Sequence, residues 1–123
     1  MATLLLVEDN VDNRDMLARR LMRKGYDVRL AANGLEGVEQ AQAIHPDLIL
    51  MDLSMPVLDG WEAIRRIRAA PGLRAIPIIA LTGHAMKDDR DRALAAGADE
   101  YMAKPLDFTS LLNIIQQRVG GHP

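Results

Sequence analysis

Short apolar runs alternate five times with longer segments of helical periodicity along this chain, and this alternation constrains the fold more than any other feature. The runs are Thr3–Val7, Val28–Ala31, Asp47–Met51, Ile76–Leu81 and Ala98–Met102. The first, third and fourth are almost wholly apolar, which is typical of parallel strands that helices cover on both faces. Five strand–helix units predict a doubly wound α/β domain, because right-handed crossovers place helices on both faces of a parallel sheet.

The intervening segments carry helix signals. Trp61 opens the third helix, which closes at Pro71-Gly72, and the Arg65–Arg68 stretch reads as its solvent-facing side. The fourth helix, about Lys87 to Ala96, is rich in alanine and charge and has few large apolar anchors. The fifth is the clearest, with Asp107 as N-cap followed by apolar residues at helical spacing: Phe108, Leu111, Leu112, Ile115 and Val119. Gly25 stands where the first helix needs a residue of positive φ.

Length and composition narrow the class. The chain has 123 residues, which predicts one domain over residues 1–119 and a short flexible tail over 120–123. A net charge of −2 without a basic face argues against nucleic-acid binding. Cysteine is absent, which excludes disulfides and thiolate chemistry. No apolar run is long enough for a membrane span and no leader opens the chain, so we expect a cytoplasmic protein.

Polar side chains follow four of the five predicted strands. Glu8 and Asp9 follow the first strand, Asp52 the third, Thr82 the fourth and Lys104 the fifth. Ligands of open α/β sheets bind outside the carboxyl ends of the strands, so these side chains are predicted to share one site.

Three carboxylates at one edge repel one another unless a cation joins them. Mg²⁺ prefers oxygen ligands and is usually held by one or two carboxylates, which indicates Asp9 and Asp52 as direct ligands and Glu8 as a direct or water-mediated one. Mn²⁺ can substitute. Lys104 and Thr82 suit phosphoryl oxygens, and a carboxylate oxygen of Asp52 can attack phosphorus to form an acyl phosphate.

Each of these residues has an ordinary structural interpretation when taken alone. Asp52 is then a turn or cap residue, Thr82 a cap, Lys104 a surface lysine, and Glu8-Asp9 the acidic start of a helix. What favours a phosphate site is their coincidence at one edge of the sheet.

The same residues carry a resemblance to a known family. VEDN (7–10), MDLSMPVLDG (51–60), ALTG (80–83) and KP (104–105) stand in order. Over nearly its whole length the chain resembles the receiver domain of two-component response regulators, of the single-domain type. The resemblance implies a flavodoxin-like sheet of strand order 2-1-3-4-5 flanked by five helices.

The resemblance also implies roles for individual residues. A histidine kinase or histidine phosphotransfer protein would phosphorylate Asp52. Mg²⁺ would be held by Glu8, Asp9, Asp52 and the backbone carbonyl of Ser54. Thr82 and Lys104 would contact the phosphoryl group.

Further implications concern the response to phosphorylation. Tyr101 would rotate inward when Thr82 moves, and the face formed by the fourth helix, fifth strand and fifth helix would change shape for an effector protein. The Lys104–Pro105 bond would be cis. Ser54 and His84 would tune the attack of water on the acyl phosphate.

Two other functions are compatible with part of this pattern. A small phosphohydrolase with an aspartyl nucleophile would often carry a second Asp two residues later, where this chain has Ser54. A receiver-like module that never uses phosphate would be expected to lose part of the acidic set or Lys104, and all are present. The expected function is therefore a phosphorelay switch rather than an enzyme, with self-phosphorylation and autodephosphorylation as its only chemistry.

Overall fold

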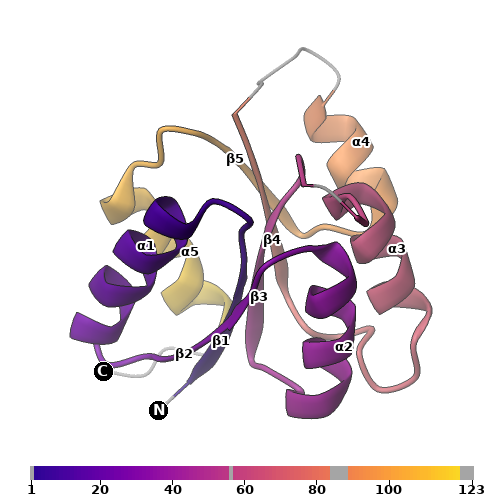
Figure 1. Ribbon diagram of the computed structural model, residues 1–123, viewed down its shortest axis with the longest axis horizontal. Helices are drawn as coiled ribbons and strands as arrows, with labels where there is room; N and C mark the ends of the chain where they lie inside the picture. Colours follow the sequence, from indigo (N-terminus) through magenta and orange to yellow (C-terminus); the bar gives the residue numbers. More distant parts are fainter. Residues whose placement is uncertain (1, 56, 84–88, 120–123) are drawn as a thin grey trace.

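A single parallel sheet forms the centre of the molecule, in a computed structural model that describes residues 2–55, 57–83 and 89–119 (Figure 1). Its strand order is β2-β1-β3-β4-β5, which confirms the predicted doubly wound topology. The central strands β1, β3 and β4 are buried along almost their whole length. The strands are β1 (Thr3–Val7), β2 (Asp27–Ala31), β3 (Leu48–Asp52), β4 (Ile78–Thr82) and β5 (Glu100–Ala103).

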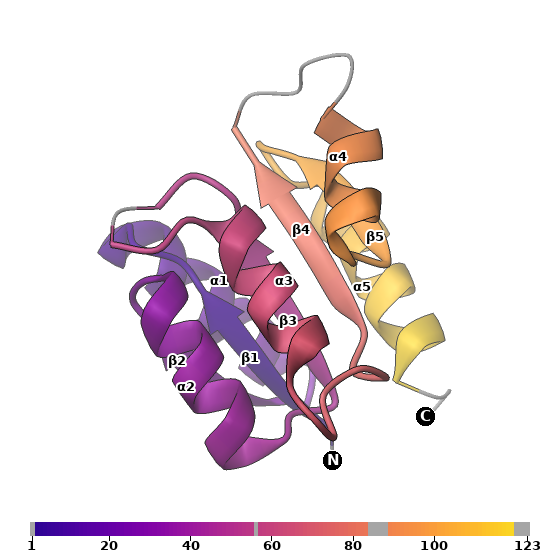
Figure 2. The same ribbon diagram turned by 90° about the vertical axis from the view of Figure 1, so that its right-hand side faces the viewer.

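Five helices cover the two faces of the sheet, with α1 and α5 on one face and α2, α3 and α4 on the other (Figures 1 and 2). Asparagine or aspartate caps four of them, and Asp107 accepts hydrogen bonds from the N–H groups of Thr109 and Ser110 at the start of α5, as predicted. No described helix combines the length and hydropathy of a membrane span. The helices are α1 (Val11–Arg23), α2 (Gly34–Ile44), α3 (Gly60–Ala69), α4 (Asp89–Ala96) and α5 (Phe108–Arg118).

The core consists of two apolar layers because side chains alternate between the faces of each strand. Leu6 and Leu50 lie in the layer under α1 and α5, whereas Val7 and Met51 lie in the layer under α2 and α3. Trp61, in the first turn of α3, packs against the second of these layers. The alternation also fixes the face to which the residues just beyond each strand point.

Three strands begin later than the sequence predicts: β3 by one residue, at Leu48 instead of Asp47, and β4 and β5 by two. β4 starts at Ile78 instead of Ile76, since the carbonyl of Ile76 accepts a hydrogen bond from Arg68 at 2.7 Å and therefore lies outside the strand ladder. β5 starts at Glu100 instead of Ala98, because the N–H of Ala98 still bonds to Ala93 in α4 at 3.0 Å. Both strands run one residue further at their carboxyl ends, and β3 likewise runs to Asp52 itself.

The prediction for Arg68 as a solvent-facing residue is wrong. Its side chain is 18% exposed and makes four hydrogen bonds to residues of the loops before β4 and β5. Its neighbours Arg65 and Arg66 are exposed, as predicted. Helical spacing separates Arg68 from the other two arginines, because it lies four residues after the buried Ile64 and so borders the buried face. A long side chain at that position can reach inward.

Candidate functional site

The carboxyl edge of the sheet brings Glu8 and Asp52 together. Asp52 is the last residue of β3, and Glu8 directly follows β1, where its N–H bonds to Ala31 at 3.0 Å. Each lies two residues beyond a leucine of the α1/α5 layer, so strand alternation directs both side chains to that face. Both are only 4% exposed. The sheet therefore holds two carboxylates side by side in a largely dry environment.

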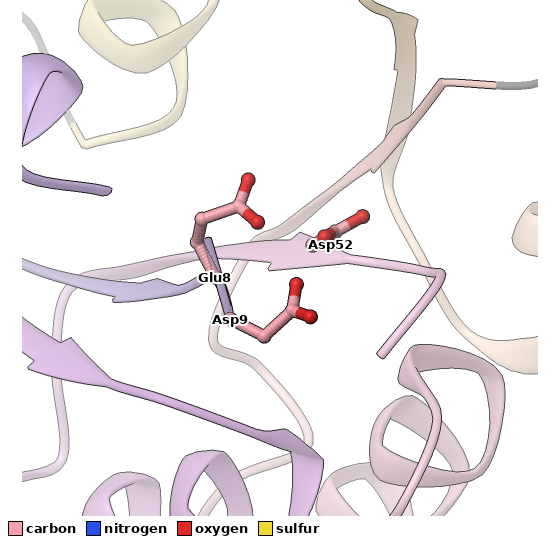
Figure 3. Close-up of side chains that lie close together, drawn as sticks. All are labelled: Glu8, Asp9 and Asp52. Atoms are coloured by element: carbon pink, nitrogen blue, oxygen red, sulfur yellow. The ribbon is translucent and has the colours of Figure 1, made fainter. Parts of the chain in front are cut away.

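Asp9 completes an acidic cluster with these two residues (Figure 3). One carboxylate oxygen from each of Glu8, Asp9 and Asp52 lies within 4.8 Å of the others, and Asp9 is the exposed member. This spacing and the all-oxygen donor set fit a hard divalent cation such as Mg²⁺. The solvent side of the cluster leaves room for the waters that Mg²⁺ usually retains.

Lys104 reaches the same carboxylates from β5. Its Nζ donates to Glu8 Oε1 at 2.6 Å and lies 3.5 Å from Asp52 Oδ2. Its backbone N–H bonds to the carbonyl of Thr82 at 2.6 Å, which continues the β4–β5 pairing past the end of the strand. The lysine is therefore positioned by the backbone of the sheet, and one cation faces three carboxylates.

The electrostatics of this cluster are unequal. Burial, followed by the hydrogen-bonded and negatively charged Glu8, raises the pKa of Asp52 to about 6, and Lys104 only partly opposes this. Burial also acts to raise the pKa of Glu8, but hydrogen bonds from Lys104 and from the Asn10 N–H outweigh it, so this pKa is lowered. For Lys104, burial acts to lower the pKa, but the two carboxylates raise it overall. Glu8 and Lys104 form the ion pair, and Asp52 carries the uncompensated charge.

The backbone around Asp52 is tightly packed. The N–H of Ser54 donates to Asp52 Oδ1 at 3.3 Å, and Ser54 itself is exposed. A Cβ at Gly60 would lie 2.2 Å from the carbonyl oxygen of Asp52, so the amino end of α3 can approach β3 only because this residue is glycine. Gly60 thus places the loop that carries Ser54 against the site.

Thr82 and Tyr101 lie on the other face of the sheet. Thr82, the last residue of β4, is 3% exposed, and it follows Leu81 of the α1/α5 layer, so alternation directs it to the α4 side. Tyr101 pairs with Ala80 in the β4–β5 register and packs against the layer under α2 and α3. The Thr82 side chain therefore shares a face with Tyr101, while its backbone carbonyl, which accepts from the Lys104 N–H, borders the site.

Two further expectations concern the loops. The Lys104–Pro105 peptide bond is cis in the structure. His84, expected to tune dephosphorylation, lies outside the described residues, as does the tail over residues 120–123.

The sequence reasoning missed two residues that shape the site. Asn10 donates its N–H to Glu8 Oε2 at 3.2 Å and caps α1 through its side chain, which accepts from the N–H of Asn13. Its signal in the sequence is an N-cap residue directly after the acidic pair. The close approach at Gly60 has only a weak signal, because Asp59-Gly60 also reads as an ordinary helix start.

A doubly wound sheet with an acidic, lysine-containing site at its carboxyl edge defines the class of this protein. The sequence model of one protein family, the response regulator receiver domain, matches residues 4–116. The chain therefore belongs to this family, and it is a receiver domain of two-component signalling, as its motifs predicted.

Known proteins agree with this assignment. The receiver domain of the sensor histidine kinase PA1611 from Pseudomonas aeruginosa PAO1 is 44% identical, and the match covers 97% of this chain and 98% of that one with a TM-score of 0.90. That crystal structure holds a magnesium ion coordinated in the active site cleft. The polar-differentiation response regulator DivK of Brucella abortus is 34% identical, with 96% of both chains covered.

A larger relative places the same domain in another setting. The hybrid signal transduction histidine kinase G of Dictyostelium discoideum is 41% identical over 117 residues. The match covers 93% of this chain but only 3% of that protein. The similarity therefore concerns the receiver domain and not the rest of the kinase.

Proposed function

We propose that Asp52 accepts a phosphoryl group from the phosphohistidine of a histidine kinase or histidine phosphotransfer protein. The observation that carries this proposal is the crowding of three carboxylates around one lysine, with Asp52 buried and bearing the uncompensated charge. A divalent cation would offset this charge, and it would also offset the negative charge of a phosphoryl group on Asp52.

In this proposal the metal is Mg²⁺, or Mn²⁺ in its place. Asp9 and Asp52 would ligate it directly, and Glu8 would do so directly or through water. The backbone carbonyl of Ser54 would be the remaining ligand from the protein. The magnesium ion in the related PA1611 receiver supports this assignment. When bound, the metal offsets charge on the carboxylates and on the phosphoryl oxygens.

The transfer step uses the groups already positioned. An oxygen of the ionised Asp52 attacks phosphorus as the bond between phosphorus and the donor imidazole nitrogen breaks, and the imidazole keeps that electron pair. With a pKa of about 6 before any metal binds, Asp52 is mostly ionised at neutral pH. Lys104 Nζ lies 3.5 Å from Asp52 Oδ2 and offsets the charge on the transferred group, while Thr82 contacts a phosphoryl oxygen.

A cavity of about 480 Å³ lies beside this position and is lined by Glu8 and Lys104 of the site. Met16 and Arg20 of α1 and Phe108 of α5 also line it. The phosphoryl group is lost by hydrolysis: water attacks phosphorus, the bond from phosphorus to the Asp52 oxygen breaks, and the carboxylate leaves with that electron pair. Self-phosphorylation from small phosphodonors and autodephosphorylation are accordingly the only reactions we assign to the chain.

The output we assign is a change of the α4, β5 and α5 face for an effector protein. Thr82 and Tyr101 share the α4 side of the sheet, which supports a path from the phosphoryl group to this face. Phosphorylation needs to shift a pre-existing equilibrium by only a few kcal/mol for such a response.

The test is modification by acetyl phosphate with Mg²⁺, followed by intact-mass spectrometry. We expect the wild-type protein to gain one phosphoryl group, and Asp52→Asn to gain none. Asp59→Asn is the matched control, because asparagine caps a helix as well as aspartate does and α3 should stay intact. Chelation of the metal should stop the reaction of the wild-type protein.

Three results would count against the proposal. Modification of Asp52→Asn at the wild-type rate would overturn the acceptor assignment. An unchanged rate after chelation would remove the metal from the mechanism. Fast, saturable turnover of phosphomonoesters would favour the phosphohydrolase instead.

A further inference from the structure

The turn between β2 and α2 contacts the candidate site through its backbone, although none of the site residues named above comes from the end of β2. The carbonyl of Ala31, the last residue of β2, accepts a hydrogen bond from the N–H of Glu8 at 3.0 Å. Three residues later, Gly34 opens α2 beside the loop that joins β3 to α3 (Figure 2). The turn therefore borders Glu8 on one side and the loop that carries Ser54 on the other.

Gly34 lies directly against the backbone of this β3–α3 loop. A Cβ at this position would overlap the carbonyl oxygen of Leu58 and would lie 2.8 Å from its carbonyl carbon. It would also lie 3.2 Å from the carbonyl oxygen of Asp59. These neighbours are main-chain atoms, which cannot turn aside as a flexible side chain can. Glycine at this position therefore sets how closely α2 and the loop approach each other.

The need for glycine at this position is steric and not conformational. Gly34 lies in the first turn of α2 and is not among the described glycines of positive φ. Alanine is normally the better helix former, so Gly34→Ala would favour α2 if the loop did not contact it. Any harm that this substitution causes must therefore arise at the contact with the loop.

The first turn of α2 is held by hydrogen bonds on both sides of Gly34. The side chain of Asn33 accepts from the N–H of Glu36 at 2.9 Å. The carboxylate of Glu36 in turn accepts from the N–H of Ala32 at 3.1 Å. Gly34 is buried between these partners, so the loop meets a fixed surface where it contacts α2.

The β3–α3 loop is short and carries backbone strain. The N–H of Gly60 donates to the carbonyl of Leu53 at 3.1 Å and closes the loop. Within it, Val57 has φ +70°, which is a rare conformation for a β-branched residue, and its side chain is 77% exposed. Such strain persists only where the surrounding backbone enforces it. Leu58, which directly follows Val57, is the residue that contacts Gly34.

We propose that Gly34 is a positioning residue of the metal site, because the amino end of α2 is a fixed stop for the β3–α3 loop. The inference rests on the proposed function, in which the carbonyl of Ser54 ligates Mg²⁺. Ser54 and Leu58 lie in one short closed loop, so a displacement at Leu58 also displaces the Ser54 carbonyl. β2 thus contributes to the site through the packing of the turn that follows it.

Isothermal titration calorimetry with Mg²⁺ tests this role. We expect Gly34→Ala to raise the dissociation constant by about tenfold or more, as is typical when the support of a metal ligand is lost. Gly37→Ala is the matched control, because it adds the same methyl group three residues later in α2. A Cβ there would lie 3.0 Å from a side-chain methyl of Val7, in the core and away from the loop. This control is expected to lose stability and to keep the wild-type affinity for Mg²⁺.

A second pair of variants tests the stop without added bulk. Glu36→Ala removes the acceptor for the N–H of Ala32 and loosens the turn, so we expect a smaller rise in the dissociation constant than in Gly34→Ala. Glu36→Gln removes the same charge but keeps an acceptor oxygen, and it should bind Mg²⁺ as the wild type does. The difference between these two variants isolates the hydrogen bond from the charge.

The position of the loop is measured in the metal-free protein by amide proton–nitrogen correlation NMR spectra. In Gly34→Ala the resonances of Ser54 and Leu58 should shift, and in Gly37→Ala they should stay at their wild-type positions. A purely structural role in α2 would confine the shifts of Gly34→Ala to the helix, and that result would overturn the proposal.

The titrations separate failure of this inference from failure of the proposed metal site. A folded Gly34→Ala protein with the wild-type dissociation constant would overturn the positioning role, and so would equal losses of affinity in Gly34→Ala and Gly37→Ala. If Gly34→Ala does not fold, equal affinities of Glu36→Ala and Glu36→Gln would overturn it. Failure of the wild-type protein to bind Mg²⁺ would instead overturn the proposed metal site, and the positioning role with it.

Discussion

The two edges of the sheet each carry a short contact between a cation and a carboxylate, and they use it differently. At the amino edge, Arg68 lies 2.8 Å from Asp99, and both groups also bond to backbone atoms of neighbouring loops. At the carboxyl edge, Lys104 lies 2.6 Å from Glu8, but Asp52 and Asp9 add two more carboxylates. The two distances are similar, but the surroundings of the contacts differ.

This difference distinguishes a cluster that stabilises the fold from a cluster that is suited to binding a ligand. Around Arg68 each charge has an opposite charge or a carbonyl, so the cluster stabilises the fold by itself. Around Lys104 the negative charges outnumber the positive one, and burial together with the neighbouring Glu8 raises the pKa of Asp52 to about 6. The carboxyl edge is therefore destabilising until a ligand that carries positive charge binds.

Breaking the amino edge should produce the largest effect on stability. Arg68→Met leaves Asp99 and three carbonyls without their charged donor, and we expect the free energy of unfolding to fall by about 2–4 kcal/mol. Urea denaturation followed by circular dichroism measures this. Arg66→Met is the matched control, since its exposed pair with Glu62 should contribute no more than about 0.5 kcal/mol. Equal losses in the two variants would show that the Arg68 cluster is not a stabilising unit.

The carboxyl edge should respond in the opposite direction. Asp52→Asn removes the uncompensated charge, and we expect the metal-free protein to become more stable by about 1–3 kcal/mol at neutral pH. The same urea experiment without divalent cations measures the gain, with Asp59→Asn as control. Destabilisation by Asp52→Asn at neutral pH would contradict the charge imbalance inferred for this site.

The pH dependence follows from the direction of the shift. Because the folded-state pKa of Asp52 lies above its ordinary value of 3.8, the folded protein binds this proton more tightly than the unfolded chain does. The penalty is full above about pH 6 and disappears as the pH falls toward 3.8. The advantage of Asp52→Asn should shrink over the same range, and an advantage independent of pH would point to another cause.

The residues that meet at the carboxyl edge of the sheet could be predicted from the sequence, whereas those at the amino edge could not. The apolar runs predict strands, and the rule that ligands bind at the carboxyl ends of parallel strands then collects Glu8, Asp52, Thr82 and Lys104. Those side chains leave the strands directly, so strand position alone determines where they lie. The family motifs identify the same positions independently.

The amino edge could not be predicted in this way. The hydrogen bonds of Arg68 depend on how far a long side chain folds back and on where two loops place their carbonyls. The pairing of Arg92 with Trp61 likewise joins residues about 30 positions apart through helix packing. Neither contact leaves a local pattern in the sequence, because tertiary packing alone brings the partners together.

A smaller effect distinguishes the roles of the two cations. Lys104→Met removes the cation from the carboxyl edge as Arg68→Met does at the amino edge, yet we expect a loss of only about 1 kcal/mol at neutral pH. The reason is that Asp52 can take up a proton: Lys104 lowers its pKa, so without the lysine this pKa should rise above its present value of about 6. Loss of Arg68 has no such compensation. Asp99 would lose its guanidinium partner, and the same carboxylate oxygen also holds the N–H of Ile78.

Magnesium provides the decisive measurement for this last variant. Mg²⁺ stabilises a folded protein that binds it, and the stabilisation grows with the ratio of its concentration to the dissociation constant. In Lys104→Met the metal meets three carboxylates without a competing cation, so we expect Mg²⁺ to recover the lost stability. In Arg68→Met it should raise the melting temperature no more than in the wild type. Equal recovery in both variants would mean that the two edges are not energetically independent, because distant sites should contribute additively.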